Sequence, residues 1–148
     1  MLGHLLGGSE IQWGPMLIRD HRVWLPNGLP LIYDTLQWHV ADPNNPKDRT
    51  GYRVRTRQGW QHMYGGKLVE QTTQALARVH IGECMKQIAR ASLPVKGMSH
   101  DEPWVMIPKG PNQDSDMQFC LDVISTPPSW LPNVPLAAEG VMGERYAK

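Results

Sequence analysis

The order of segments in this 148-residue chain predicts an α+β fold in which helices cover an antiparallel sheet. Short apolar runs separated by turn residues fill residues 16–33, a pattern typical of a β-hairpin. Residues 66–91 carry apolar side chains at helical spacing with no proline, which predicts one long helix. Two further apolar runs flank His100, Asp101 and Glu102 and predict a second hairpin with a polar tip.

The first region should contain two or three short strands. Apolar pairs and triplets occupy residues 17–18, 23–25 and 29–33, and the turn signal Pro26-Asn27-Gly28 separates the last two. Farther along, residues 52–57 alternate with period two and place Arg53, Arg55 and Arg57 on one face of a strand. That basic face is either an ordinary solvated surface or a surface that contacts phosphates.

The long helix has apolar positions on more than one stripe, so we expect it to be central and packed on several sides. Gly82 lies inside it, where glycine costs about 1 kcal/mol relative to alanine. Such a glycine would permit the close approach of a neighbouring element.

A second helix is expected near residues 114–126. Asp114 or Ser115 could cap its start, and Pro127 and Pro128 would end it. The tail predicts a last strand that begins near Leu136 and runs into a glycine-rich end.

Length and composition are those of a single globular domain spanning residues 1–148. Hydrophobic residues make up 41% and charged residues 20% of the chain, which argues against wholesale disorder. The formal net charge of +1 decides nothing about nucleic-acid binding, because a basic stripe can be offset by carboxylates elsewhere.

The two cysteines, Cys84 and Cys120, favour buried thiols over a disulfide and therefore a reducing cytoplasm. Neither cysteine shows metal-ligand spacing to another cysteine or a nearby histidine. The N-terminus has a short apolar patch without a basic region, so we expect no signal peptide, no membrane span and an intracellular protein.

The triplet His100, Asp101 and Glu102 is the most informative feature. Carboxylates at the tip of a hairpin can hold a hard cation without being buried in the sheet. Three polar residues in a tight turn are also what any solvated turn contains, so the triplet needs supporting motifs.

Three motifs accompany it, in an order that carries a resemblance. They are Tyr64-Gly65-Gly66-Lys67-Leu68-Val69-Glu70, then Gln74 to Arg78, and finally Leu136-Ala137-Ala138-Glu139-Gly140 with Gly143-Glu144-Arg145-Tyr146. Together with the triplet they resemble the C-terminal palm portion of family A DNA polymerases, relatives of DNA polymerase I, and most closely the bacteriophage type. The resemblance implies a nucleotidyltransferase of DNA replication that uses Mg²⁺, primer-template DNA and dNTP, in the cytoplasm of a host cell.

The resemblance assigns roles at the hairpin. Asp101 matches the motif C aspartate, a catalytic residue and magnesium ligand, and Glu102 is the adjacent carboxylate with a supporting catalytic role. His100 matches a histidine that lies near the primer terminus.

Roles also follow for the long helix. Gln74 matches a glutamine that faces the minor groove of the new base pair, where one donor can check acceptors common to correct pairs. An exposed helix residue without such a role is the alternative. Lys67 and Arg78 are implied DNA-binding residues that could hold phosphates.

The chain departs from the family pattern at three places. Val79 stands where most relatives have an aspartate, Ser99 replaces an apolar residue, and Pro103 follows the acidic pair. Because proline lacks a backbone donor, we expect the hairpin ladder beside the site to be broken or bulged.

Other parts of the family are not recognisable in the sequence. We find no motif A aspartate strand, no fingers helix with its arginine and lysine, and no exonuclease domain, and Asp20, Asp34 and Asp42 have no motif A context. We therefore expect this polypeptide to be inactive alone and to need a second polypeptide that carries motif A and fingers.

Two alternatives remain. The chain could be an inactive or truncated fragment that acts only as a DNA-binding or accessory module. It could also be an unrelated metal-dependent nuclease that uses Asp101, Glu102 and Glu139, although a structural carboxylate is the simpler reading of Glu139. The six tryptophans are scattered along the sequence, and we expect most of them in cores or subunit contacts.

Overall fold

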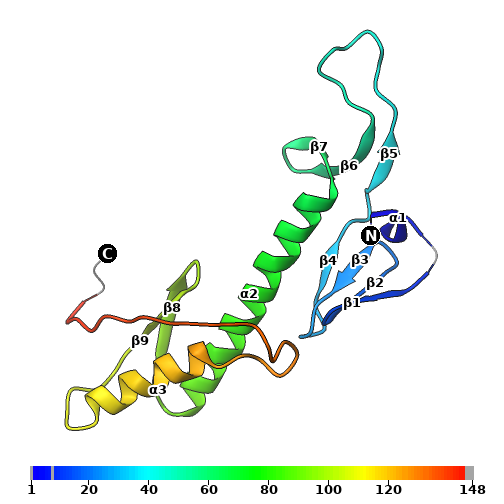
Figure 1. Ribbon diagram of the computed structural model, residues 1–148. Coiled ribbons are helices and arrows are strands. Elements are labelled where there is room, and N and C mark those ends of the chain that lie inside the picture. The colour runs from blue at the N-terminus through cyan, green and yellow to red at the C-terminus, as the bar shows by residue number, and fades with distance from the viewer. Residues whose placement is uncertain (1, 8, 146–148) are drawn as a thin grey trace. The chain divides into compact units, whose positions relative to one another are not determined.

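The computed structural model describes residues 2–7 and 9–145. Its backbone forms two compact units, Met1–Leu76 and Ala77–Lys148 (Figure 1). In chain order the elements are α1 (Leu2–Leu5), β1 (Ile11–Trp13), β2 (Met16–Arg19), β3 (Arg22–Trp24), β4 (Pro30–Ile32), β5 (Gln37–His39), β6 (Gly51–Thr56), β7 (Gly59–His62), α2 (Gly65–Arg90), β8 (Val95–Ser99), β9 (Glu102–Val105) and α3 (Gln113–Ser125). The predicted α+β class is confirmed, and the single domain expected from chain length stays a prediction.

The antiparallel strands are divided among three small sheets. Strands β1 to β4 form a meander in sequence order, β5 to β7 form a second sheet, and β8 pairs with β9. The strands expected in residues 16–33 correspond to β2, β3 and β4. Asp20 and His21 join β2 to β3 with φ angles of 49° and 58°, the left-handed conformation that two-residue hairpin turns require.

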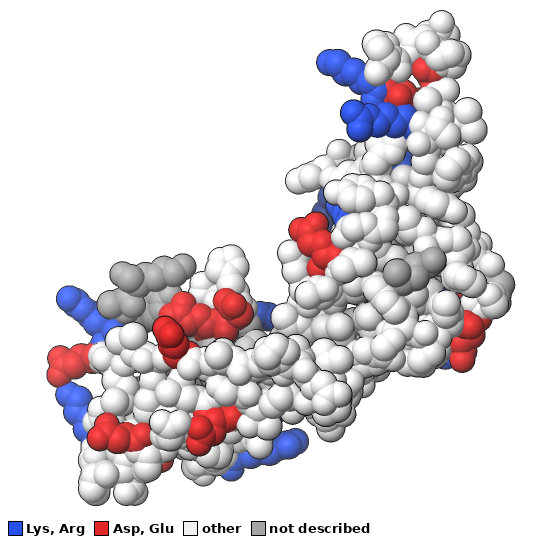
Figure 2. Space-filling model, in the orientation of Figure 1, with Lys and Arg blue, Asp and Glu red and all other residues white. Residues whose placement is uncertain are grey.

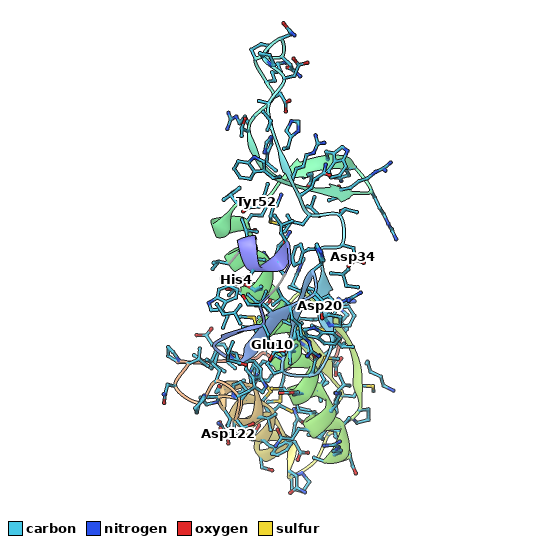
Figure 3. All side chains as sticks on the ribbon, turned by 90° about the vertical axis from the view of Figure 1, so that its right-hand side faces the viewer. His4, Glu10, Asp20, Asp34, Tyr52 and Asp122 are labelled. Atoms are coloured by element: carbon cyan, nitrogen blue, oxygen red, sulfur yellow. The ribbon has the colours of Figure 1, made fainter. Side chains whose placement is uncertain are left out.

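The core of the first unit lies between the β1–β4 sheet and the start of α2. Leu5, Ile18, Val23 and Leu68 are fully buried there. Tyr52 of β6 packs at the edge of this cluster beside α1, where its hydroxyl would lie 3.8 Å from a Cβ added at Gly3 (Figure 3). One face of β6 is therefore turned toward the core.

A buried tyrosine ties α2 to the strands of this unit. The Tyr33 hydroxyl donates to Gln71 Oε1 at 2.8 Å, and burial raises the pKa of Tyr33 to about 12. The group therefore stays a neutral donor, so this bond is maintained throughout the ordinary pH range.

Helix α2 agrees within one residue at each end with the long helix expected from apolar spacing. The expectation for Gly82 is wrong, however. No described atom outside the local helix backbone lies within 4 Å of a Cβ added there, so no neighbouring element needs the glycine. Its helix-propensity cost is not offset by a close contact.

The core of the second unit forms where α2 meets α3 and the β8–β9 hairpin. Ile88, Leu93 and Val123 are buried with the two cysteines. Cys84 and Cys120 are free thiols, as predicted, and burial raises the pKa of both, that of Cys84 to about 11. Thiols held protonated in this way pack as small apolar groups.

Two α2 side chains satisfy carbonyls at the end of α3. His80 Nε2 lies 2.9 Å from the Ile124 carbonyl, and Cys84 Sγ donates to the Val123 carbonyl at 3.5 Å. The last carbonyls of a helix have no partner inside it, so these contacts supply what α3 lacks. The His80 ring is also 3.6 Å from Cys84 Sγ, a pairing that the sequence reading missed although the two residues are four apart on a helix.

The start of α3 differs from the prediction in its cap. Asn112 occupies the cap position without a side-chain capping bond, and Asp114 and Ser115 lie inside the first turn. Ser115 Oγ donates to the Asn112 carbonyl at 2.7 Å instead of capping an amide. Asp114 still suits the first turn, because a carboxylate there interacts favourably with the helix dipole.

The tail does not form the predicted strand. Residues 126–145, the described part of the chain after α3, contain no strand. A Cβ at Gly140 would overlap the end of the Met117 side chain and lie 3.3 Å from Leu121, so the tail packs on α3 instead of pairing with a sheet. Tyr146, part of the tail motif, lies outside the described residues.

None of the six tryptophans is fully buried, although Trp13 packs against the core of the first unit, and the expectation that most lie in cores or subunit contacts stays a prediction. Trp38 and Trp60 are 55% and 46% exposed, and Trp104 is 37% exposed. Trp13, Trp24 and Trp130 are half-buried.

No helix in the described ranges has both the length and the apolar character that crossing a bilayer demands.

Candidate functional site

The β8–β9 hairpin carries the predicted acidic pair at its tip. Ser99 pairs with Glu102, so His100 and Asp101 form a two-residue turn. The side chains of Asp101 and Glu102 are exposed. The sequence therefore placed these carboxylates correctly at an accessible hairpin end.

The turn holds His100 in an unusual backbone conformation, with φ of 56°. A residue with a Cβ pays about 1 kcal/mol in this left-handed region, although histidine tolerates it better than most. The turn places Asp101 at the exposed tip and Glu102 at the first position of β9.

The ladder beside the acidic pair is intact, contrary to expectation. Pro103 pairs with Met98, and the irregularity lies at the other end of the hairpin, between Val95 and Gly97. Because β9 has β8 as its one partner among the described strands, a proline nitrogen can face outward at no cost to the ladder. The indole of Trp104 covers Gly97 from 3.1 Å, measured to a Cβ added there.

Arg78 of α2 approaches the hairpin directly. Its Nη1 lies 2.6 Å from Met98 Sδ and 3.4 Å from the carbonyl oxygen of His100. The guanidinium thus contacts the turn that contains Asp101. The structure brings Arg78 and His100 together, which sequence spacing alone did not predict.

Lys67 and Gln74 belong to the first unit. Lys67 Nζ donates to Gln61 Oε1 at 3.3 Å, and exposed Gln74 has its Nε2 3.5 Å from Glu70 Oε1. Gln74 also borders a cleft of about 520 Å³. Leu31, Ile32, Tyr33, Val54, Arg55, Thr56, Met63, Gln71 and Ala75 form the rest of its lining.

The acidic pair suits a hard cation, because exposed carboxylate oxygens are the ligands that Mg²⁺ prefers. Within residues 2–7 and 9–145, no three histidine, cysteine, aspartate or glutamate side chains converge on a point that could hold a metal ion. Asp101, Glu102 and Glu139 are therefore not gathered into the cluster that the nuclease alternative needs. The tip offers two adjacent carboxylates for a site that other ligands would have to complete.

The β5–β7 sheet contains a second group of polar side chains, which sequence reasoning found only in part. Period-two alternation located Arg53 and Arg55 on one face of β6. It could not show that Gln37 and Trp60 lie beside them, because that depends on the register of β5 and β7.

Comparison with known proteins gives one indication of function. The chain is 30% identical over 129 residues to a DNA polymerase of Bacillus phage SP02, a match that covers 85% of this chain and 19% of that polymerase. No family model matches the chain, and no solved structure matches it. The chain spans about a fifth of the length of the polymerase to which it is distantly related.

Proposed function

We propose that this chain is the C-terminal palm piece of a family A DNA-directed DNA polymerase and supplies the motif C carboxylate of its active site. The observation that carries the proposal is the exposed Asp101-Glu102 pair at the tip of a two-residue hairpin turn. Similarity to a phage DNA polymerase over most of the chain supports it.

In this proposal Asp101 is a magnesium ligand and Glu102 supports it from the adjacent position. Bound Mg²⁺ would neutralise charge on the reacting phosphates and favour ionisation of the primer 3′-hydroxyl. The chain's own contribution is to present Asp101 in an exposed turn, next to the His100 carbonyl that Arg78 contacts. A contact that limits movement of the turn matters because octahedral magnesium sites tolerate little displacement of their ligands.

The remaining predicted contacts are to primer-template DNA. His100 lies next to Asp101 in the turn and would approach the primer terminus. Gln74 would contact the minor groove of the new pair, while Lys67 and Arg78 would contact phosphates. Arg78 also contacts the His100 carbonyl in the hairpin turn. Its loss should therefore affect both DNA binding and catalysis.

A two-metal centre needs carboxylates from at least two places in the fold, because one position cannot fix two ions in octahedral geometry. We place the second set, motif A, and the fingers that hold dNTP on a second polypeptide that docks onto this chain.

Paired substitutions test the role of the tip. Asp101→Asn keeps the side-chain shape and removes the charge, while Asp20→Asn makes the same change in the β2–β3 turn, where Asp20 is also exposed. In primer extension by the assembled polymerase we expect Asp101→Asn to lower the rate about a hundredfold or more, since a metal ligand supplies several kcal/mol. DNA binding should stay near the wild-type level in both variants.

The rival is a DNA-binding or accessory module without a catalytic part, and the basic β6 strand favours it. The same experiment separates the two functions. If Asp101→Asn and Asp20→Asn extend primers equally well, the tip has no role in catalysis and the accessory reading is correct.

A further inference from the structure

Positive charge is concentrated in one short segment of the chain. Residues 37–62 contain five of the fifteen lysines and arginines but only two of the fourteen acidic residues. The rest of the chain has more acidic than basic residues, so the net charge of +1 conceals a basic segment. Figure 2 shows Lys and Arg side chains gathered at the loop between β5 and β6.

This segment folds into the β5–β7 sheet, which has two unlike faces. Arg53 pairs with Gln37 on one side and His62 on the other, and Arg55 pairs with Trp60. Directly paired residues share a face, so one face carries two arginines and an indole. The opposite face carries Tyr52 and Val54, which pack against the core of the first unit.

The basic face is partly preorganised. With the Gln37 amide turned so that its oxygen faces Arg53, that oxygen accepts from Arg53 Nε and Nη2, both at 2.9 Å. The Arg53 guanidinium lies 4.4 Å from the centre of the Trp60 ring. Arg55 of β6 and Arg57, in the turn that follows β6, are exposed, and their side chains make no hydrogen bond or ion pair within the part of the chain that the structure describes. One arginine is therefore fixed against the indole, and two more are available to a ligand.

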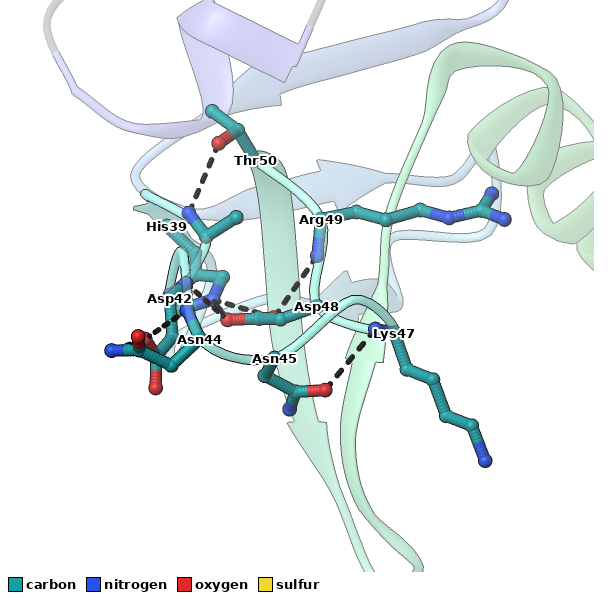
Figure 4. Close-up of polar contacts among 9 residues, drawn as sticks. His39, Asp42, Asn44, Asn45, Lys47, Asp48, Arg49 and Thr50 are labelled. Atoms are coloured by element: carbon teal, nitrogen blue, oxygen red, sulfur yellow. Dashed lines mark hydrogen bonds and ion pairs between the residues drawn. The ribbon is translucent and has the colours of Figure 1, made fainter.

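The two carboxylates of the segment are directed into its loop (Figure 4). Asp48 accepts from the Asp42 amide at 2.8 Å, from the Arg49 amide at 3.0 Å and from His39 Nε2 at 2.8 Å. Asp42 Oδ1 accepts from the backbone and side-chain nitrogens of Asn44. Neither carboxylate makes an ion pair with an arginine of the sheet.

We infer that this face of the β5–β7 sheet binds single-stranded nucleic acid, with Arg55 and Arg57 on the backbone phosphates and Trp60 stacking on a base. A cationic face with an exposed aromatic is how single strands are bound without sequence preference. An unpaired strand fits better than a duplex, because a duplex keeps its base faces stacked and would leave the indole without a partner. In a polymerase this strand would be the unpaired template.

The inference goes beyond the proposed metal site and does not depend on it. Asp101 lies in the turn of the separate β8–β9 hairpin, so Asp101→Asn should bind single strands as the wild type does. An acidic protein segment is the other kind of partner that a cationic face could bind. Unlike a single-stranded nucleic acid, it offers no base to stack on Trp60.

Matched tryptophan variants of the full chain test the stacking. Trp38 and Trp60 have similar exposure but lie on opposite faces of the same sheet. We expect Trp60→Leu to weaken binding of a labelled oligodeoxythymidylate about five- to hundredfold in fluorescence anisotropy. Trp38→Leu should bind within about twofold of the wild type, and circular dichroism checks that both variants fold.

Arginine variants test the phosphate contacts. Arg55→Ala with Arg57→Ala should lower the slope of log affinity against log salt by about 1.4, since each single-strand phosphate contact contributes about 0.7. Lys86→Ala with Lys96→Ala, a matched change of two exposed cations elsewhere, should leave the slope unchanged. Equal effects of Trp60→Leu and Trp38→Leu would overturn the inference, as would equally tight binding of polyglutamate or of the oligonucleotide in duplex form.

Discussion

At the scale of residues, a few polar side chains determine where whole segments lie. His80 is 8% exposed and contacts the end of α3, and Arg78, two residues earlier on α2, contacts the turn that carries the candidate metal ligand. Each joins α2 to a segment more than twenty residues away in the sequence. Residues of this kind combine stability with positioning of the site.

Replacing His80 should be costly. His80→Ala leaves the Ile124 carbonyl without its side-chain partner in a buried setting, a loss of about 1–3 kcal/mol in the free energy of unfolding. Urea unfolding followed by circular dichroism measures it. His62→Ala, a change at an exposed histidine, should cost less than about 0.5 kcal/mol, and equal losses in the two variants would contradict the contact.

The Asp48 network should depend on pH. Hydrogen bonds from the Asp42 amide, and then from His39, lower the pKa of Asp48 below its ordinary value. A carboxyl whose folded pKa is lowered stabilises the fold above its unfolded pKa of about 3.9 and loses that contribution as the pH falls through the folded value. We therefore expect the Asp42 amide to lose protection from hydrogen exchange in acid, below about pH 4.

Asp48→Asn provides the control for this prediction, because it cannot titrate. Its Asp42 amide should show the same protection at pH 3 and at pH 6. Asp34→Asn, at an exposed aspartate of the same unit, should keep the wild-type pH dependence. A wild-type amide whose protection does not change with pH would contradict the account.

At the scale of elements, segments with strong local patterns were predictable. The spacing of apolar residues located α2 within one residue, and turn residues located β2, β3 and β4. The strand expected from Leu136 failed for a physical reason. A strand exists only where a partner edge accepts its hydrogen bonds, and the tail packs through Gly140 on α3 instead.

The candidate site was also predictable only in the parts that form a local sequence pattern. Asp101 and Glu102 stand out because adjacent carboxylates in a hairpin turn form a local pattern. The contact of Arg78 with His100 and the position of Trp60 beside Arg55 depend on packing and on strand register, which the sequence does not encode locally. The sequence therefore predicted the carboxylates at the hairpin tip but not the contact of Arg78 with the turn.

Helix α2 offers a test at this scale. Since no described side chain or neighbouring element approaches Gly82, Gly82→Ala should raise the free energy of unfolding by about 0.5–1 kcal/mol through helix propensity alone. Gly65→Ala, at the first residue of the helix, should change it less. Destabilisation by Gly82→Ala in urea unfolding would show that another element approaches the glycine after all.

At the scale of the whole molecule, charge and function are distributed along the chain. The basic segment at residues 37–62 belongs to the first unit, and the acidic hairpin tip belongs to the second. A polymerase needs both kinds of surface, cationic for DNA and anionic for metal ions. In our proposal this polypeptide supplies part of each, and a second polypeptide completes the active centre.

Primer extension with a truncated partner tests this central claim most directly. The partner is the phage SP02 polymerase lacking the segment that matches this chain, supplied with this chain either separately or fused in its place. We predict that extension requires this chain, is lost with Asp101→Asn and is retained with Asp20→Asn. Extension by the truncated polymerase alone, or at an unchanged rate with Asp101→Asn, would contradict the account.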